Sequence, residues 1–206
     1  MKLQLALDRL TKDECFRVLD ETKDSIDMIE IGTGVIKEYG MSIVRDIREH
    51  YPKHIILADM KTCDAGKHEA RQVFEAGADI TTVMAFASNT TITDMLEVAK
   101  EGNQQVMVDL LEIDTKEKIA ELSYIGVDFV SLHVGKDKQE KGGFHSGLFS
   151  LLEGYDFQIA VAGGINLDTL SDIIPYQPDI VIVGSAITGA DNPGEVSRKI
   201  KAALSK

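Results

Sequence analysis

Cysteine is scarce in this sequence, since only Cys15 and Cys63 occur among its 206 residues and they form no CxxC motif. Two cysteines cannot supply the disulfide framework that stabilises many secreted domains. The first residues, Met1–Asp8, reach an acidic side chain too early to contain the apolar core of a secretory signal peptide. We therefore expect a reduced, cytoplasmic protein.

Long apolar runs are also missing. The longest stretch without a charged side chain, Ile80–Thr93, is shorter than the roughly 18–20 apolar residues that a membrane-spanning helix needs. Hydrophobic residues make up 44% of the chain and charged residues 27%, a balance typical of globular proteins that argues against wholesale disorder. We expect a globular protein without a membrane segment.

Basic side chains are outnumbered, because 22 Lys and Arg residues stand against 34 Asp and Glu residues and give a formal net charge of −12. A chain with this charge is repelled by polyphosphates and by anionic lipid surfaces. We therefore expect neither nucleic acid nor a membrane among its partners. A small phosphorylated substrate stays compatible, because a local cationic or backbone pocket can override the overall charge.

Short apolar, β-branched runs recur along the chain. Each is continuously or nearly continuously apolar, as expected for strands of a parallel sheet that is covered on both faces. They predict eight strands. The runs are Leu3–Leu7, Met28–Ile31, Ile55–Ala58, Ile80–Met84, Val106–Leu110, Phe129–Leu132, Ile159–Ala162 and Ile180–Val183.

Segments with helical periodicity lie between these runs. Gly77, Gly102 and Gly126 follow the last turn of three such segments, where a left-handed residue often ends a helix. Thr11 precedes Glu14 by three residues, which predicts a capping box at the start of another helix. The clearest helical segments are Val35–His50, Ala65–Ala76, Ile92–Lys100, Lys116–Ile125 and Glu195–Leu204.

Eight strand–helix units in 206 residues correspond to about 26 residues each, and no linker or low-complexity segment interrupts the alternation. This count favours an α/β fold, a single (β/α)8 TIM barrel in which residues 1–206 form one domain. The alternative is an open, doubly wound sheet, which alternates strands and helices in the same way.

Ionisable side chains stand at or near the ends of five predicted strands. In a barrel these ends meet at one mouth, where the active site lies, so we expect the five side chains to share a cavity. Any one of them alone could instead cap a helix or bridge to a neighbour. The residues are Asp8, Glu30, Asp59, Asp109 and His133.

The seventh and eighth predicted strands end in small residues, Gly163 and Gly164 in one case and Gly184 and Ser185 in the other. In TIM barrels the loops after the last two strands often bind phosphate through backbone N–H groups. Glycine, which has no side chain, lets a ligand approach these groups closely. We expect these residues to bind a phosphate group. The alternative is that the glycines only permit tight turns.

The motif Asp59-Met60-Lys61-Thr62-Cys63-Asp64 begins where the third predicted strand ends. Asp59 and Lys61 are two residues apart, so an extended backbone would point both side chains the same way. Flanking carboxylates would keep Lys61 cationic and suited to stabilise an oxyanion. Asp59 and Glu30, on adjacent strands, could also supply two oxygen ligands to Mg²⁺. A surface ion-pair cluster of little energetic weight is the alternative.

The order of these motifs resembles the orotidine 5′-monophosphate decarboxylase suprafamily of small (β/α)8 barrels, in which D-x-K-x-x-D follows the third strand. Within it the chain is most similar to the 3-hexulose-6-phosphate synthase family, over essentially its whole length. The 3-keto-L-gulonate-6-phosphate decarboxylase family is the close alternative. The segments that carry the resemblance are Leu3–Asp8, Glu30–Thr33, Ala58–Gly66, His133–Gln139 and Ala160–Ile165.

Four positions bear on the choice between these two families. At one of them, beside the eighth-strand phosphate loop, decarboxylases tend to have Arg, and Ser185 of this chain is compatible with the synthase. The resemblance implies Asp after the fifth strand in synthases, where this chain has Asp109, and a small residue before the double glycine, where it has Ala162. Decarboxylases have Arg three residues after the sixth-strand histidine, and Lys136 at that position matches neither family cleanly. The synthase is favoured, and some decarboxylase-like behaviour stays open.

The resemblance implies a metal-dependent aldehyde-lyase of the aldolase type. It would add formaldehyde to C1 of D-ribulose 5-phosphate through a 1,2-enediolate and give D-arabino-hex-3-ulose 6-phosphate. Mg²⁺ on Glu30 and Asp59 would hold the enediolate oxygens. Lys61 would hydrogen-bond the developing negative charge and would be oriented by Asp8 and Asp64.

The same resemblance implies roles for the remaining site residues. His133 would move the C1 proton, since imidazole titrates nearest neutral pH. Thr33 and Asp109 would position substrate hydroxyls. Asp64 would also reach into the neighbouring subunit, which implies a homodimer with shared active sites. The other substrate-binding residues would be Lys136, Gly163, Gly164, Gly184 and Ser185.

Two other functions fit the sequence less well. A ribulose-phosphate 3-epimerase would want paired histidines and aspartates around a transition metal, whereas one histidine stands at the predicted mouth. A non-catalytic phosphosugar-binding protein should have lost at least one of the chemically essential side chains, and none is lost. Those side chains are Asp8, Glu30, Asp59, Lys61 and Asp64.

Overall fold

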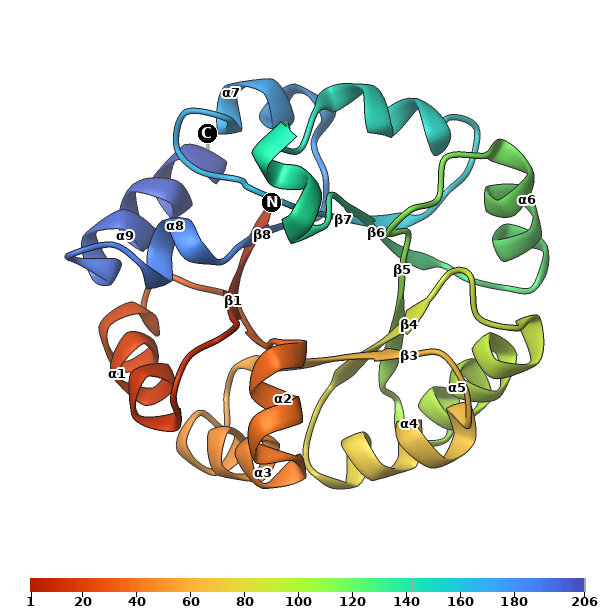
Figure 1. Ribbon diagram of the computed structural model, residues 1–206, viewed down its shortest axis with the longest axis horizontal. Helices are drawn as coiled ribbons and strands as arrows, with labels where there is room; N and C mark the ends of the chain where they lie inside the picture. The colour runs from red at the N-terminus through yellow and green to blue at the C-terminus, as the bar shows by residue number, and fades with distance from the viewer. Residues whose placement is uncertain (142, 206) are drawn as a thin grey trace.

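The computed structural model describes residues 1–141 and 143–205, and a ring of parallel strands forms its centre (Figure 1). Each strand pairs with the next in sequence and β8 pairs with β1, so the sheet closes. The predicted (β/α)8 barrel is confirmed, and the open sheet is excluded. The strands are β1 (Lys2–Leu7), β2 (Met28–Ile31), β3 (Ile55–Thr62), β4 (Ile80–Met84), β5 (Gln105–Asp109), β6 (Phe129–His133), β7 (Gln158–Ala162) and β8 (Ile180–Val183).

Helices surround this ring on its outer face (Figure 1). Among the described residues, no helix is both long enough and apolar enough to cross a lipid bilayer. The helices are α1 (Lys12–Thr22), α2 (Thr33–Tyr39), α3 (Met41–His50), α4 (Gly66–Glu75), α5 (Asn89–Gly102), α6 (Lys116–Tyr124), α7 (Leu170–Ile173), α8 (Ser185–Thr188) and α9 (Pro193–Leu204), with 3₁₀ segments η1 (Lys136–Lys141), η2 (Ser146–Leu151) and η3 (Ile174–Tyr176).

Two apolar layers stabilise the barrel, because successive strand residues point alternately toward the helices and toward the barrel axis. The outer layer lies between strands and helices and includes Leu3, Leu5 and Leu7 of β1. Full burial of one such leucine contributes roughly 1.5–3 kcal/mol. The inner layer fills the barrel with Met28, Leu57, Ile80, Met107, Phe129, Ala160, Ala162, Ile180 and Ile182.

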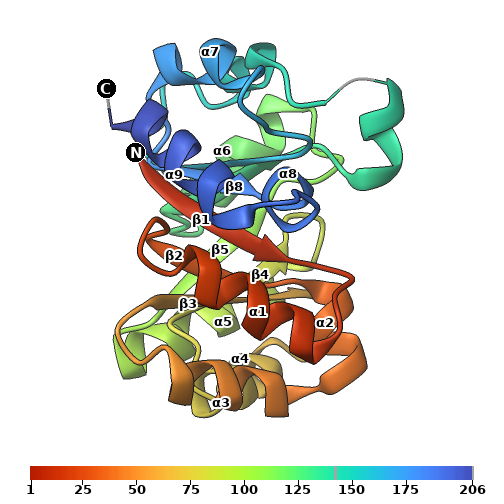
Figure 2. The same cartoon turned by 90° about the vertical axis from the view of Figure 1, so that its left-hand side faces the viewer.

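Polar side chains replace this apolar filling toward one end of the barrel. The N-terminus lies near the end at which β1 begins, and β1 points toward the opposite end, the mouth (Figure 2). Glu30, Asp59 and Asp109 are buried there although they are charged residue types. Because burying a charge is costly unless it is paired, these three carboxylates need cationic or hydrogen-bonding partners at the mouth.

Strand β3 is longer than predicted and irregular, because it continues through the D-x-K motif to Thr62. The register with β4 shifts between Ala58 and Thr62. Lys61 lies inside this irregular segment with a φ of +49°, a conformation that non-glycine residues rarely adopt. Asp59 and Lys61 therefore do not lie on the regular extended backbone that their spacing predicts.

Several predicted helix boundaries are correct and others are wrong. The capping box at Thr11 and Glu14 is confirmed. The predicted helix Val35–His50 is divided into α2 and α3 at Gly40, whose φ is +59°. Gly102 is the last residue of α5, and the left-handed residue that follows this helix is Asn103, which tolerates the conformation through its short polar side chain.

The connection between β6 and β7 differs from the predicted alternation, because the 3₁₀ segments η1 and η2 stand in place of an α-helix. After β7, the short α7 passes into η3, which contains Pro175. A proline cannot donate the backbone hydrogen bond that a longer helix would need there. The outer ring is therefore least regular beside β7.

Cys15 on α1 is expected to resist thiol reagents in the folded protein. Its side chain is fully buried, and burial, followed by the charge of Glu14, raises its pKa to about 11. The reactive thiolate is therefore scarce at neutral pH. In a Cys63→Ser variant, which lacks the exposed thiol, Ellman's reagent should react only after denaturant is added. Rapid reaction of the native variant would contradict the packing of α1 against the barrel.

Candidate active site

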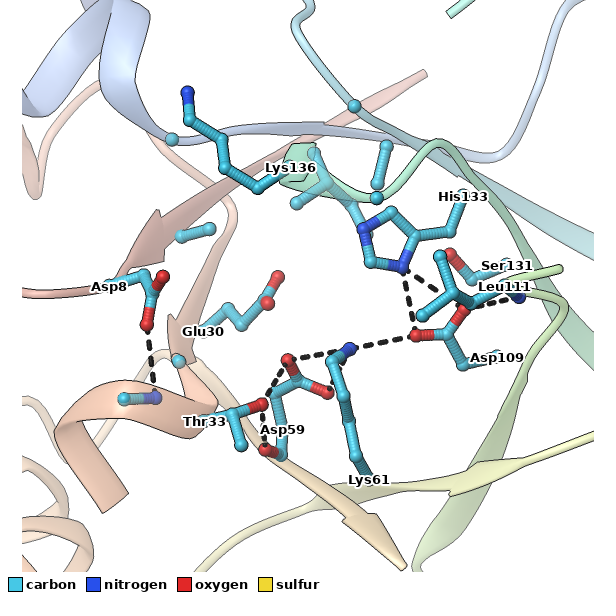
Figure 3. A pocket seen from close by; sticks show the side chains of 18 of the residues that line it. Asp8, Glu30, Thr33, Asp59, Lys61, Asp109, Leu111, Ser131, His133 and Lys136 are labelled. Carbon is cyan, nitrogen blue, oxygen red and sulfur yellow. Dashed lines mark hydrogen bonds and ion pairs between the residues drawn. The ribbon is translucent and has the colours of Figure 1, made fainter. Parts of the chain in front are cut away.

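A cavity of about 550 Å³ lies at the mouth of the barrel. It is lined by residues at the C-terminal ends of strands and in the loops that follow, as Figure 3 shows. Of the residues predicted for the site, only Asp64 is absent from its lining. The predicted residues that line it are Asp8, Glu30, Thr33, Asp59, Lys61, Asp109, His133, Lys136, Gly163, Gly164, Gly184 and Ser185.

Lys61 connects two acidic side chains in this cavity (Figure 3). Its ammonium nitrogen lies 2.8 Å from Asp109 Oδ2 and 3.1 Å from Asp59 Oδ2. Burial by itself would lower the pKa of Lys61, but the two carboxylates outweigh it and hold that pKa above its usual range. Lys61 is therefore cationic at neutral pH.

Asp59 is a partner of Lys61, as the flanking carboxylates of the motif predict, whereas Asp109 is a partner that the sequence did not indicate. Asp8 accepts a hydrogen bond from the backbone N–H of Gly34 at 3.0 Å and lies 3.4 Å from Arg9 Nε. Asp64 lines a separate, smaller cavity beside the first turns of α4 and α5. Within the described residues of this one chain, Lys61 pairs with Asp59 and Asp109 and forms no ion pair with Asp8 or Asp64. Contact of Asp64 with the Lys61 of a neighbouring subunit stays a prediction.

Asp109 links Lys61 to His133. His133 Nδ1 lies 2.9 Å from Asp109 Oδ2, and the backbone N–H of Leu111 donates to Oδ1 at 2.9 Å. Burial would raise the pKa of Asp109, but His133 and Lys61 lower it below its usual value. The carboxylate is thus ionised and occupied by protein donors. Asp109 also lines the cavity, so the expectation that it positions a substrate hydroxyl stays a prediction.

His133 is held in one orientation by this contact. Burial opposes its charged form, but the hydrogen bond and charge of Asp109 outweigh that effect and raise the pKa of His133. With Nδ1 directed at Asp109, the tautomer that protonates Nδ1 leaves a lone pair on Nε2. His133 also lines the cavity, so this lone pair is available to a bound ligand.

Glu30 and Asp59 bring two buried carboxylates together from adjacent strands. Gln4 Nε2 donates to Glu30 Oε2 at 2.6 Å, and Thr33 Oγ1 donates to Asp59 Oδ2 at 2.8 Å. Burial and, second, the negative charge of Asp59 raise the pKa of Glu30. A cation between the two carboxylates would relieve this unfavourable pairing.

The donor set at these two residues fits Mg²⁺. Mg²⁺ prefers hard oxygen ligands and is commonly bound through one or two carboxylates, with water and substrate oxygens completing its octahedron. In the part of the chain that the structure describes, no cluster of three or more His, Cys, Asp or Glu side chains is arranged to hold a metal. Glu30 and Asp59 would therefore bind the ion together with water or substrate and not as a closed protein cage.

The glycine-rich part of the cavity has two kinds of glycine. Gly163 has a φ of +119°, and a Cβ added to it would lie 2.5 Å from the carbonyl oxygen of Val134. The fold itself therefore requires glycine here, as the tight-turn alternative proposed. At Gly184 an added Cβ would meet Ala6 O at 3.5 Å, an ordinary contact. Crowding by the protein therefore does not explain why position 184 is a glycine. The absent side chain leaves room for a ligand to approach the backbone there.

Several lining residues were missed by the sequence analysis. Arg9 and Lys37 line the cavity together with Lys136 and add cationic groups to it. Gln4 and Thr82 lie behind it, and both contact the carboxylates. A usable signal was present for Gln4, because it is the one polar residue inside the apolar run of β1.

Comparison with known proteins places the chain in a family. The sequence profile of the orotidine 5′-phosphate decarboxylase / HUMPS family matches residues 1–200. The chain belongs to this family. A 3-hexulose-6-phosphate synthase from Bacillus subtilis (strain 168) is 37% identical over 204 residues, which cover 98% of this chain and 97% of that relative.

Solved structures of similar proteins have the same barrel. The crystal structure of 3-hexulose-6-phosphate synthase from Salmonella typhimurium has a TM-score of 0.95 at 39% identity, covering 99% of this chain and 98% of that chain. The crystal structure of 3-keto-L-gulonate-6-phosphate decarboxylase from Vibrio cholerae O1 biovar El Tor has a TM-score of 0.85 at 28% identity, covering 99% and 95%. The resemblance read from the motifs is confirmed at the level of family and fold.

Gly163→Ala is expected to destabilise the barrel more than a glycine replacement in open space. Gly154 offers the control, because its φ is +90° and a Cβ added there would meet nothing within 4 Å. Gly154→Ala should cost about 1–2 kcal/mol for the left-handed backbone alone. Gly163→Ala should lose roughly 1–3 kcal/mol more, because its Cβ overlaps the backbone of Val134. Urea denaturation measures both, and equal losses would contradict the crowding at Gly163.

Proposed function

We propose that this chain catalyses the reversible addition of formaldehyde to C1 of D-ribulose 5-phosphate, which gives D-arabino-hex-3-ulose 6-phosphate. The observation that carries the proposal is the run of contacts from Asp59 through Lys61 and Asp109 to His133 at the mouth. Similar proteins named 3-hexulose-6-phosphate synthase, matched over nearly their whole length, support the same C–C bond-forming reaction.

His133 is proposed to remove the proton from C1. Asp109 raises the pKa of its imidazole, which makes the neutral ring a stronger base, and Nε2 is the nitrogen left to accept the proton. Loss of this proton gives the 1,2-enediolate. C1 of the enediolate then attacks the carbon of formaldehyde, and the aldehyde oxygen takes up a proton that the protonated His133 can return.

Lys61 is proposed to stabilise the negative charge that develops on the enediolate. Its ammonium is held between Asp59 and Asp109, so it need not reorganise when the charge appears. The same carboxylates disfavour the neutral amine, which a Schiff-base aldolase would require. We therefore assign Lys61 to electrostatic stabilisation and not to covalent catalysis.

Glu30 and Asp59 are proposed to hold Mg²⁺ as the cofactor. When bound, this ion would supply Lewis-acid stabilisation to adjacent oxygens of the sugar. Gln4 and Thr33 hold the two carboxylates in place from outside, so the ligand oxygens are already oriented in the protein.

The phosphate of the substrate is proposed to bind where β7 and β8 end. Gly164 and Gly184 expose backbone there, and Ser185 adds a hydroxyl to the same cavity. Binding energy at this remote end would orient C1 toward His133. Lys136 also lines the cavity, and its ammonium stands where the related decarboxylases are expected to have Arg. This observation keeps 3-keto-L-gulonate 6-phosphate as the second candidate substrate.

A homodimer with shared active sites is proposed from the position of Asp64. Asp64 lies outside the cavity of its own chain, beside Gly66 and His68 at the start of α4. In the suprafamily that the motif resembles, the last aspartate of the motif completes the neighbouring subunit's site. An aspartate that completes the neighbouring subunit's site should not line the cavity of its own chain, and Asp64 does not line it.

Formaldehyde consumption tests the activity. With D-ribulose 5-phosphate and Mg²⁺ the purified protein should consume formaldehyde, and removal of divalent metal with EDTA should lower the rate by about 100-fold or more, because the lost Lewis-acid stabilisation is worth several kcal/mol. Added Mg²⁺ should restore it. Full activity of the metal-free protein would contradict the assignment of Glu30 and Asp59.

Two controls accompany this assay. Turnover of 3-keto-L-gulonate 6-phosphate alone would show that the decarboxylase assignment is correct and the synthase assignment wrong. Lys61→Ala should abolish turnover and retain sugar-phosphate binding, measured by calorimetry, because the phosphate-binding residues are untouched. Parent protein that binds the sugar phosphate and turns over neither substrate would indicate a binding protein.

Subunit mixing tests the shared site. Lys61→Ala and Asp64→Asn variants should each be inactive alone. If each site takes Lys61 from one subunit and Asp64 from the other, a heterodimer of the two variants has one intact site. Equal mixing with subunit exchange should then restore about one quarter of the parent activity, since about half of the dimers are mixed. No recovery in mixtures whose exchange is verified by mass spectrometry would refute the shared site.

A further inference from the structure

A buried hydroxyl lies directly behind the charge network, and the proposed mechanism does not use it. Thr82 on β4 is 1% exposed and does not line the cavity. It lies two residues beyond Ile80, which belongs to the apolar filling of the barrel, so its side chain shares that inward face. Thr82 cannot touch a substrate, but it can act on residues that do.

Thr82 contacts both functional residues of the D-x-K motif. Its Oγ1 accepts a hydrogen bond from the backbone N–H of Lys61 at 2.9 Å and donates one to Asp59 Oδ1 at 2.8 Å. The directions follow from chemistry, since an N–H can only donate and an ionised carboxylate can only accept. One hydroxyl therefore joins the backbone of Lys61 to the side chain of Asp59.

The sheet irregularity explains why this hydroxyl is needed. Ala58 pairs with Thr81, and Thr62 pairs with Val83. Between these two pairs β3 advances by four residues, whereas β4 advances by two. Thr82 is the one β4 residue opposite the extra β3 segment. The left-handed backbone at Lys61 takes its N–H out of the regular ladder, and the Thr82 hydroxyl supplies the acceptor that a strand carbonyl would otherwise provide.

The same contact orients the carboxylate of Asp59. Thr82 donates to Oδ1, while Thr33 donates to Oδ2 at 2.8 Å. Hydroxyls from β4 and α2 thus hold the carboxylate from two directions. Each carboxylate oxygen retains a further acceptor direction for the Lys61 ammonium or for a cation.

We infer that Thr82 is a positioning residue that holds the Lys61 ammonium and the Asp59 carboxylate in their working geometry. The inference depends on the proposed function for its effects on rate and on Mg²⁺ binding, but not for its effect on the structure. A small displacement of groups that act on the reacting atoms has a large effect on turnover. Binding of the distant phosphate should change little.

Thr81 provides a matched control. It precedes Thr82 on β4 and is equally buried. Among the residues that the structure describes, its Oγ1 donates only to the carbonyl of Ala58, at 3.3 Å. It is two residues from Val83, which packs in the outer layer, so it points away from the barrel axis. Thr→Val at either position keeps the shape and removes one buried hydroxyl.

The test compares Thr82→Val, Thr82→Ser and Thr81→Val. Thr82→Val should lower kcat by about 10- to 100-fold with less than about a threefold change in KM for the sugar phosphate. It should also weaken binding of Mg²⁺ alone, measured by calorimetry. Thr82→Ser, which keeps the hydroxyl, should recover most of both losses, and Thr81→Val should match the parent protein.

Crystal structures of the parent and of Thr82→Val supply a readout that is independent of activity. The variant should lose the left-handed conformation at Lys61 or the contact of its ammonium with Asp109. Should Thr82→Val not fold, Thr82→Cys takes its place, because a thiol is only a weak donor and acceptor.

The outcomes are distinct. Parental kcat and Mg²⁺ affinity in Thr82→Val, an unchanged Lys61 in its crystal structure, or equal losses in Thr81→Val would each overturn the inference. A parent protein inactive on both substrates would refute the proposed function alone. In that case the crystal structures still decide whether Thr82 positions Lys61 and Asp59.

Discussion

The pairing of buried carboxylates with one ammonium is the constraint on which the mouth of this barrel depends. Glu30, Asp59 and Asp109 are each less than a tenth exposed, and Lys61 is the cation that contacts two of them. Leaving such charges unpaired in a low-dielectric interior would cost several kcal/mol per ion. Neutral donors, the Gln4 amide and the hydroxyls of Thr33 and Thr82, contact the carboxylates of Glu30 and Asp59.

This charge network explains the irregular strand beside it. Lys61 lies on β3 and must reach Asp109 on β5, across the intervening β4. The extra residues of β3 and the left-handed backbone at Lys61 change the direction of its side chain from that of a regular strand. Local strain of this kind persists where surrounding contacts stabilise it, and Thr82 supplies such a contact from β4.

Much of the fold could be predicted from the sequence, because strands buried on both faces leave continuous apolar runs. The ends of β2, β4 and β8 are those predicted, whereas β3 extends beyond Ala58. That extension was missed because Asp59 and Lys61 are polar, and polar residues after an apolar run indicate the end of a strand and the start of a loop. The division of the predicted helix at Gly40 and the 3₁₀ segments before β7 depend on packing that periodicity does not contain.

The sequence by itself determined the family, the barrel and the group of strand-end residues, because a parallel barrel brings the ends of its strands to one mouth whatever their distances along the chain. Only the tertiary structure decided which of those residues touch. It gave Lys61 the partners Asp59 and Asp109, placed Asp64 outside the cavity, and put Thr82 behind the motif. Such contacts depend on register and side-chain direction across neighbouring strands, and a one-dimensional pattern does not specify these.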